Sequence, residues 1–301
     1  MSSLETARYV ARALSILKYS NWDWVPIGLG CLHLAYILGI FVAYPYMPWS
    51  LRIAAGCLYA ISISWSINSV SHNFIHNPFF VSKTLNTLFS YLLSITIGFS
   101  QAMYNFIHMR HHSGNMDRPE TNGNTIDYIS IYKHGQEGKP ENIWKYTFLS
   151  FFRIDPNEIL DGMSEKRKDE ARLARRELVA FTGFFVLLGF LNWEFILFLL
   201  PFWYLGHSLS SLNGYYEHFG GNPDKPIAWG VSTYDRLYNL TWLNNGYHAE
   251  HHFRPKQHWT KMHELHEQIK DRQEEEGVRV IRPPHALGFL DPDLPHAESR
   301  G

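Results

Sequence analysis

Long uncharged segments constrain the fold of this chain more than any other feature of its sequence. Across residues 24–109 only Arg52 and Lys83 carry a formal charge, and across residues 178–216 only Glu194 does. A helix that crosses a bilayer needs about 20 consecutive, mostly apolar residues. The net charge of −1 would suit a soluble protein. The distribution of the charges instead predicts an all-α integral membrane protein with large aqueous loops.

Four of the apolar runs are predicted to cross the membrane as two helical hairpins. The first hairpin turns at a proline-containing break with aromatic residues, 45–49, and the second turns at residues 192–194. A single membrane domain is expected over residues 1–270, followed by a polar C-terminal tail over residues 271–301. The predicted spans are residues 25–44, 51–70, 178–191 and 195–212.

Basic residues set the predicted orientation in the membrane. The segment 110–176 contains twelve Lys and Arg residues, whereas the turns at 45–50 and 192–194 contain none. Because short cytoplasmic loops are enriched in Lys and Arg, both termini and this long loop are expected in the cytoplasm. The apolar run 85–103 must then re-enter the membrane or lie in its plane, since a fifth crossing would move the long loop outside.

Charge and cysteine content exclude several other classes of protein. The balance of 27 basic and 28 acidic residues gives no basis for binding nucleic acid. Two cysteines without a C-x-x-C spacing exclude a disulfide framework, a zinc ribbon and a rubredoxin-like iron site. The first 24 residues contain five charged residues and no clean apolar core, so no cleavable signal peptide is expected.

Histidine spacing carries the strongest functional signal. On a helix, residues three and four positions apart lie on one face, which brings their imidazoles close together. Several neutral nitrogen donors that converge from rigid elements are what a transition metal needs. Of the 17 histidines, eight form three clusters with these spacings: His72 and His76; His108, His111 and His112; His248, His251 and His252.

The number of clustered histidines predicts two metal ions, because eight or nine imidazoles are too many for one. The three clusters must then lie on one side of the membrane, which requires the run 85–103 not to cross. This agrees with the orientation drawn from Lys and Arg alone. A non-catalytic membrane metal-binding protein is a remote alternative, but its histidines would line the spans, and these clusters lie outside them.

The three clusters resemble the histidine boxes of the membrane fatty-acid desaturase and hydroxylase superfamily, over about residues 25–260. The resemblance implies a cytoplasmic helical cap that holds a non-haem di-iron centre, with O₂ as co-substrate. The segment 213–220, N-G-Y-Y-E-H-F-G, is similar to a further histidine motif of alkane hydroxylases and implies a ninth ligand. The implied iron ligands are His72, His76, His108, His111, His112, His218, His248, His251 and His252.

The sequence also departs from well-known branches of this superfamily. It contains no H-P-G-G motif, so no fused cytochrome b5 domain is expected, and its two cysteines exclude a fused rubredoxin. The electron donor is therefore expected to be a separate ferredoxin-, rubredoxin- or cytochrome b5-type protein with its reductase. The first box has three intervening residues rather than four, which weakens an assignment to the acyl-CoA Δ9 branch.

The implied chemistry is oxidation of an aliphatic chain. An unactivated methylene has no acidic proton, so its hydrogen is removed only by a strong oxidant of the kind that di-iron and O₂ supply. The expected function is an O₂-dependent fatty-acyl desaturase that introduces a C=C bond. The E-H-F-G motif keeps two alternatives open: a desaturase-like alkyl or fatty-acid hydroxylase, and a decarboxylase that forms a terminal alkene from a fatty acid.

Residues near the boxes are assigned supporting roles. Carboxylates commonly orient metal-binding imidazoles, and the nearest candidates are Asp117, Glu217 and Glu250. His207 lies 11 residues before His218, about three helical turns, so its role as a ligand is left open. His33 is expected to be packed or hydrogen-bonded within a span. A solvated helix on the cytoplasmic surface is expected over residues 257–276, with His258, His263 and His266.

Overall fold

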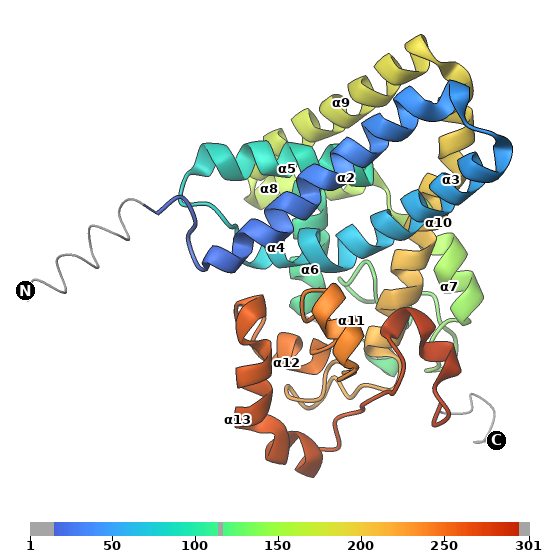
Figure 1. Cartoon of the computed structure of the whole chain (residues 1–301). Helices are drawn as coiled ribbons and strands as arrows, with labels where there is room; N and C mark the ends of the chain where they lie inside the picture. The colour runs from blue at the N-terminus through green and yellow to red at the C-terminus, as the bar shows by residue number, and fades with distance from the viewer. Residues whose placement is uncertain (1–14, 114–116, 295–301) are drawn as a thin grey trace, which may run out of the picture.

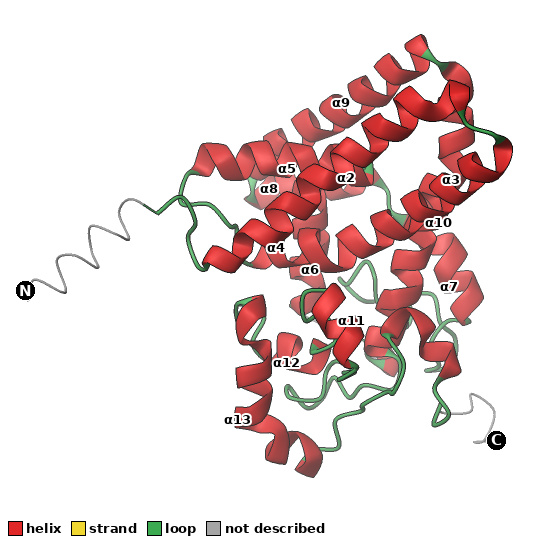
Figure 2. Cartoon of the chain, in the orientation of Figure 1, coloured by secondary structure: helices red, strands yellow, loops and turns green. Residues whose placement is uncertain are grey.

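Helices make up all the regular structure of the described residues. The computed structural model describes residues 15–113 and 117–294, and Figure 2 shows helices joined by loops across this part of the chain. This confirms the all-α prediction. In Figure 1 the longer helices fill the upper part of the view, and the short helices of the C-terminal third gather below them.

The first hairpin forms where the sequence predicts it. Helix α2 (Trp24–Ala43) and helix α3 (Trp49–Ser66) are joined by a short turn. Helix α3 continues through a five-residue π-helical turn, Ile67–Ser71, directly into α4 (His72–His76). A π-helical turn holds one residue more than an α turn, so it rotates the side chains that follow by about 100° relative to an unbroken helix.

The apolar run 85–103 forms two helices rather than one. Helix α5 (Lys83–Ile97) ends at Gly98, whose φ of +65° is in the left-handed region that glycine adopts without strain. Helix α6 (Gln101–His112) then starts in a new direction. Fifteen residues of helix span about 22 Å, less than the roughly 30 Å of a bilayer core. The length of α5 therefore agrees with an element that does not cross.

The second hairpin turns at Asn192, within the predicted break. Helix α9 (Lys168–Leu191) ends there, and α10 (Trp193–His218) begins with the Asn192 side chain accepting a hydrogen bond from the Phe195 N–H. Helix α10 packs most extensively against α3. At this contact a Cβ on Gly206 would lie 2.7 Å from the Cβ of Ile63, so only glycine permits the close approach.

Three helical stretches of the described chain are long and apolar enough to cross a membrane: Asn21–Tyr46, Trp49–His76 and Trp193–His218. Helix α9 is not among them, because its first half is strongly charged. Four crossings, their sidedness and the cytoplasmic position of the cap stay predictions.

Shorter elements complete the described structure. Helices α7 (Ile143–Leu149) and α8 (Pro156–Lys166) lie in the long hydrophilic loop. Helices α11 (Arg236–Thr241), α12 (His248–Phe253) and α13 (Met262–Glu275) follow α10. The remaining short elements are 3-10 turns at Asn21–Asp23, Tyr44–Tyr46, Pro119–Thr121, Ser150–Arg153, Trp259–Lys261 and His285–Leu290.

The predicted polar tail is described only in part, and most of the N-terminal segment is not described. Part of the segment predicted as a polar tail is packed: Ile281 and His285 are buried, and the turn His285–Leu290 contacts α10. The rest of that tail, residues 295–301, lies outside the described residues. Residues 1–14, where most of the charges argue against a signal peptide, also lie outside them.

Candidate metal centre

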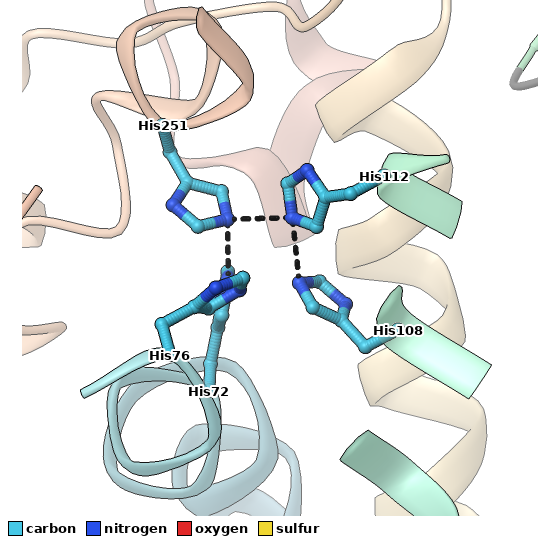
Figure 3. A group of neighbouring side chains, drawn as sticks. All are labelled: His72, His76, His108, His112 and His251. Carbon is cyan, nitrogen blue, oxygen red and sulfur yellow. Dashed lines mark hydrogen bonds between the residues drawn. The ribbon is translucent and has the colours of Figure 1, made fainter. Parts of the chain in front are cut away.

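The first histidine pair takes its direction from the π-helical turn. His72 begins α4 directly after the turn, and His76 ends it. Within the turn, Asn68 Nδ2 donates to the Ser64 carbonyl at 2.8 Å and to Ser210 Oγ of α10 at 3.2 Å, which fixes the turn against α10. Both imidazoles point toward α6 and α12 (Figure 3).

Helix α6 carries the second cluster and is held at its start by a buried carboxylate. Glu177 of α9 accepts hydrogen bonds from Ser100 Oγ at 2.6 Å and from the Ala102 N–H at 2.9 Å. A negative charge at this helix end also complements the helix dipole. The far end of the helix carries His108, His111 and His112.

The remaining histidines come from the end of α10 and from α12. His218 is the last residue of α10. Helix α12 starts at His248 and is tied to the preceding loop by Ser232, whose Oγ accepts from the Ala249 N–H at 3.0 Å. The same Ser232 hydroxyl donates to Glu250 at 2.7 Å.

Five histidines form one group, which we call the five-histidine group. The Nε2 atom of His251 lies 2.9 Å from Nε2 of His72 and 3.0 Å from Nε2 of His112. Nε2 of His112 is also 2.9 Å from Nε2 of His108 (Figure 3). Each member offers a nitrogen within 4.8 Å of those of the others; the members are His72, His76, His108, His112 and His251.

Four further histidines form a neighbouring four-histidine group. Nε2 of His218 lies 2.9 Å from Nε2 of His111 and 3.0 Å from Nε2 of His248, and a nitrogen of His252 completes the group within the same 4.8 Å limit. All four side chains are buried. The nine histidines expected from the sequence thus converge from α4, α6, α10 and α12 as a set of five and a set of four. Their role as ligands stays a prediction.

Carboxylates lie behind the four-histidine group. Asp127 Oδ2 is 2.8 Å from Nδ1 of His111, and Asp117 Oδ2 is 2.6 Å from Nδ1 of His218. Two of the three expected carboxylates therefore lie beside this group, since Glu217 Oε1 also approaches Nδ1 of His248, at 3.9 Å. An acceptor on Nδ1 directs the Nε2 lone pair toward the centre of the group, which suits metal binding.

In the five-histidine group the acceptor on Nδ1 is an amide oxygen instead of a carboxylate. Asn245 Oδ1 lies 3.2 Å from Nδ1 of His72. The Asn245 amide nitrogen donates to Glu217 at 2.6 Å, so the same side chain joins the two groups. Within residues 15–113 and 117–294 no carboxylate is seen bonded to the five-histidine group.

Carboxylates give His111 a different pKa from other imidazoles of the centre. Burial lowers the pKa of His108, His112 and His251 well below the ordinary value, because the charged form loses its hydration. Burial acts in the same direction on His111, but Asp127 and more distant carboxylates outweigh it and raise the pKa of His111 to about 9. Burial also lowers the pKa of His248 and His252 in the four-histidine group, so these imidazoles and those of His108, His112 and His251 are neutral donors. His111 instead lies in a negative field strong enough to raise its pKa.

The third expected carboxylate, Glu250, occupies a different position. Its side chain is fully buried, and it accepts hydrogen bonds from Ser232 Oγ, from Tyr234 Oη at 2.9 Å and from His266 Nδ1 at 2.7 Å. Its described contacts are with these residues rather than with an imidazole of either group. Glu250 thus anchors α12 to α13, although its position next to His251 in the sequence suggested a direct role.

Three residues that sequence reasoning missed support the centre. Asp127 lies 16 residues after His111 in a loop without a motif, and only its complete burial marks it. Asn245 lies three residues before the last box, but its bond to His72 could not be read from spacing. His285 is buried, with Nδ1 4.0 Å from Glu217 and Nε2 2.9 Å from the Val231 carbonyl.

The other described histidines lie outside both groups. His207 donates from Nε2 to the Ile97 carbonyl at 2.9 Å and contacts no imidazole of the centre. His33 is bonded to Ser62 within the first hairpin, at 2.9 Å, as expected for a packed histidine. Of the three expected on a surface helix, His263 and His266 lie on α13, whereas His258 precedes it and bonds to Asp23 at 2.9 Å.

The donor set fits two cations of the iron type. Buried nitrogens without a hydrogen-bond partner include His76 Nε2 in the first group and both ring nitrogens of His252 in the second. A buried polar atom without a partner costs free energy unless something binds it. Imidazole donors in this number suit iron. The carboxylates of Asp117, Asp127 and Glu217 balance part of the cationic charge.

An apolar cavity of about 450 Å³ reaches both histidine groups. Its walls include His72 and His108 of the five-histidine group and His111, His218 and His248 of the four-histidine group. The remaining wall is mainly aliphatic and aromatic, and no Lys or Arg lines it within the described chain. The cavity therefore suits an uncharged hydrocarbon next to the candidate metal centre.

Comparison with known proteins adds two findings. The family model described as fatty acid desaturase matches residues 47–284 of this chain. An sn-1 acyl-lipid omega-3 desaturase (ferredoxin) from Synechocystis sp. is 28% identical over 204 residues, which cover 63% of this chain and 53% of the relative. The chain thus spans about half the length of the curated relative that it matches.

Proposed function

The chain belongs to the fatty acid desaturase family, and we propose that it is an O₂-dependent di-iron oxidoreductase that introduces a C=C bond into a fatty-acyl chain. One observation carries the proposal. Members of both histidine groups line the same apolar cavity, so a bound hydrocarbon lies next to both candidate metal positions. A non-catalytic metal-binding protein would have no use for this cavity.

The nine histidines would hold two iron ions, five at one and four at the other. With O₂, such a pair supplies the oxidising power that removal of hydrogen from an unactivated methylene requires. The contribution of the chain itself is positional. Asp127, Asp117 and Asn245 fix the directions of His111, His218 and His72, and the apolar wall holds the hydrocarbon and excludes water.

The surroundings follow from the same proposal. Three described helices are long and apolar enough to cross a bilayer. The basic residues of 110–176 predict that the histidine groups lie at its cytoplasmic face. Among the described residues no Lys or Arg lines the cavity, which favours a substrate whose charged head lies outside it. A separate redox protein would deliver the electrons; the Synechocystis relative is named as a ferredoxin enzyme, which favours that donor type.

A desaturase-like hydroxylase is the second candidate. His218, from the E-H-F-G motif that resembles alkane hydroxylases, lies within the four-histidine group rather than beside it. This supports a nine-histidine centre without deciding between loss of a second hydrogen and return of oxygen. Decarboxylation to a terminal alkene is less well supported, because no Lys or Arg of the described chain lines the cavity wall to pair with a carboxylate.

Lipid analysis tests the proposed reaction. The chain is expressed in cells whose acyl lipids, alcohols and volatile products are followed by mass spectrometry, beside the same chain carrying His251→Ala. A new internal double bond that appears only with the intact chain is the expected result. A new alcohol, or an alkene one carbon shorter than its precursor, would instead identify the hydroxylase or the decarboxylase.

A control variant keeps this test specific to the centre. His263→Ala changes an exposed histidine of α13 that belongs to neither group. It is expected to produce the double bond at the level of the intact chain. Loss of product in both variants would show that the assay reports protein yield rather than the reaction.

A further inference from the structure

Two apolar cavities lie end to end along α10. The first, described above, is lined by residues of α10 from His218 back to Trp203. At 1.5 Å per residue, these two positions are about 22 Å apart along the helix axis. The cavity therefore follows α10 away from the histidine groups into the apolar part of the molecule.

The second cavity continues in the same direction. It has a volume of about 540 Å³ and lies between α9 and α10, where its α10 wall extends from Trp203 back to Trp193. It is open on one side, because Val186, Trp193 and Leu197 of its wall are exposed. Figure 1 shows these two helices meeting at one end of the molecule. Its wall is apolar apart from Thr182. Such a wall suits a hydrocarbon tail and not a polar head group.

Trp203 stands where the two cavities meet. Three residues line both: Gly98, Phe181 and Trp203. Trp203 has the largest side chain of the three and is the only one of them on α10, the helix that both cavities follow. Its indole is thus the natural partition between them.

The indole is held in this position from several sides. Nε1 of Trp203 donates to the Ile97 carbonyl at 3.1 Å, at the end of α5. The ring packs edge-on against Phe151 and His207, with centroids 5.0 and 5.1 Å apart. A Cβ on Gly98 would lie only 2.3 Å from Nε1, so the positive-φ glycine that ends α5 also makes room for the indole.

We propose that Trp203 limits how far a hydrocarbon bound at the histidine groups extends along α10, and that it thereby sets the chain length of the substrate. The inference rests on the proposed function for the identity of the ligand. A tail that leaves the histidine groups follows the apolar wall until it meets the indole. Removing the indole should join the second cavity to the first and give the tail further apolar space along α10.

The expected effect follows from the burial of methylene groups. Each methylene that moves from water into an apolar site favours binding by about fourfold in affinity. With Trp203 in place, this gain stops at the chain length that reaches the indole. Without it, the gain continues with each further methylene that the second cavity accepts.

Binding is measured without turnover, so that the inference and the proposed function fail separately. The purified full-length, iron-loaded protein is titrated with straight-chain saturated fatty acids of graded length, and its thermal stabilisation is recorded. For the wild type the affinity should rise with length and then level off. Trp203→Ala should move this limit to longer acids, whereas Trp203→Phe, which keeps a ring in the partition, should stay close to the wild type.

A second change in the same cavity sharpens the test. Leu200 lies three residues before Trp203, on the same face of α10, and lines only the second cavity of the two. Leu200→Trp combined with Trp203→Ala should refill the opened space and return the limit toward the wild-type length. Should Trp203→Ala not fold, Trp203→Leu should shift the limit by a smaller amount.

Three results would count against the inference: an unchanged limit in folded Trp203→Ala or Trp203→Leu, an equal shift in Trp203→Phe, or no reversal by Leu200→Trp. A shifted limit in protein that forms no double bond would support the partition and contradict the proposed function. In active protein, the longest acyl chain that gains a double bond should change in the same order as the binding limit.

Discussion

The five-histidine group and the four-histidine group share α6 and α12 but differ in what lies behind their imidazoles. The four-histidine group has Asp127 on His111 and Asp117 on His218, and all four of its side chains are buried. The five-histidine group has an amide, Asn245, on His72, and two of its members are only half-buried. Carboxylates orient two imidazoles of the four-histidine group, whereas the five-histidine group offers one more nitrogen donor.

This difference teaches how one helix can serve two sites. On α6, His108 and His112 lie one turn apart and face the five-histidine group, while His111 faces the other group and the loop that holds Asp127. A carboxylate on Nδ1 makes an imidazole a stronger donor. We therefore expect the four-histidine group to hold its ion through fewer but stronger donors.

The largest expected effect comes from removing neighbouring ligands of different groups. His251→Ala leaves four imidazoles in its group, and His252→Ala leaves three in the other. Each variant should weaken the ion of its own group and keep the other, so iron per chain should fall toward one, further for His252→Ala. Activity should fall by at least about 100-fold in both, because the chemistry needs two ions. Iron analysis of purified protein and an activity assay measure this.

An equal loss of both ions in the two variants would break the comparison, since it would mean that the histidines form a single cooperative site. His263→Ala serves as the control, as in the lipid assay, and should keep both ions.

A smaller effect is expected from the carboxylate behind His111. Asp127→Asn keeps the shape of the side chain and its acceptor oxygen but removes the charge. It should weaken iron binding by the four-histidine group by about 10–100-fold and leave the other group unchanged. Competition with a chelator of known affinity measures the two ions separately. Asp271→Asn, an exposed carboxylate of α13, is the matched control.

The amide behind His72 provides the reciprocal variant. Asn245→Ala removes the bond to His72 and should act mainly on the five-histidine group, nearer the lower end of the same range of about 10–100-fold, because the lost partner is uncharged. If Asp127→Asn and Asn245→Ala released the same ion first, the assignment of the two supports to different groups would be wrong.

The smallest effect on iron is expected at Glu250. Its carboxylate binds Ser232, Tyr234 and His266 rather than an imidazole of the centre. Glu250→Gln should lower the free energy of unfolding by about 1–3 kcal/mol, because buried hydrogen bonds to a charge are lost. Thermal denaturation measures the loss, and iron per folded chain should stay unchanged. Release of iron from folded Glu250→Gln protein would show that Glu250 supports the metal centre and does not act only as an anchor between α12 and α13.

Local patterns in the sequence were sufficient for several elements. The break at 192–194 and the first hairpin follow from apolar length and turn residues, which act within a few positions of the chain. The i, i+3 and i+4 spacings placed His108, His111 and His112 together because they lie on one helix. The sequence analysis did not predict that the run 85–103 breaks at Gly98, because a single glycine in an apolar run does not by itself indicate the end of a helix.

The sequence by itself determined an all-α chain with apolar helices and nine histidines suited to metal, because these features depend on residue type and helical period. Only the tertiary structure decided the division into five and four, the supports Asp127 and Asn245, and the anchoring role of Glu250. It also decided the place of Trp203 between two cavities. These depend on contacts between residues far apart in the chain, which have no fixed spacing and form only when the helices pack.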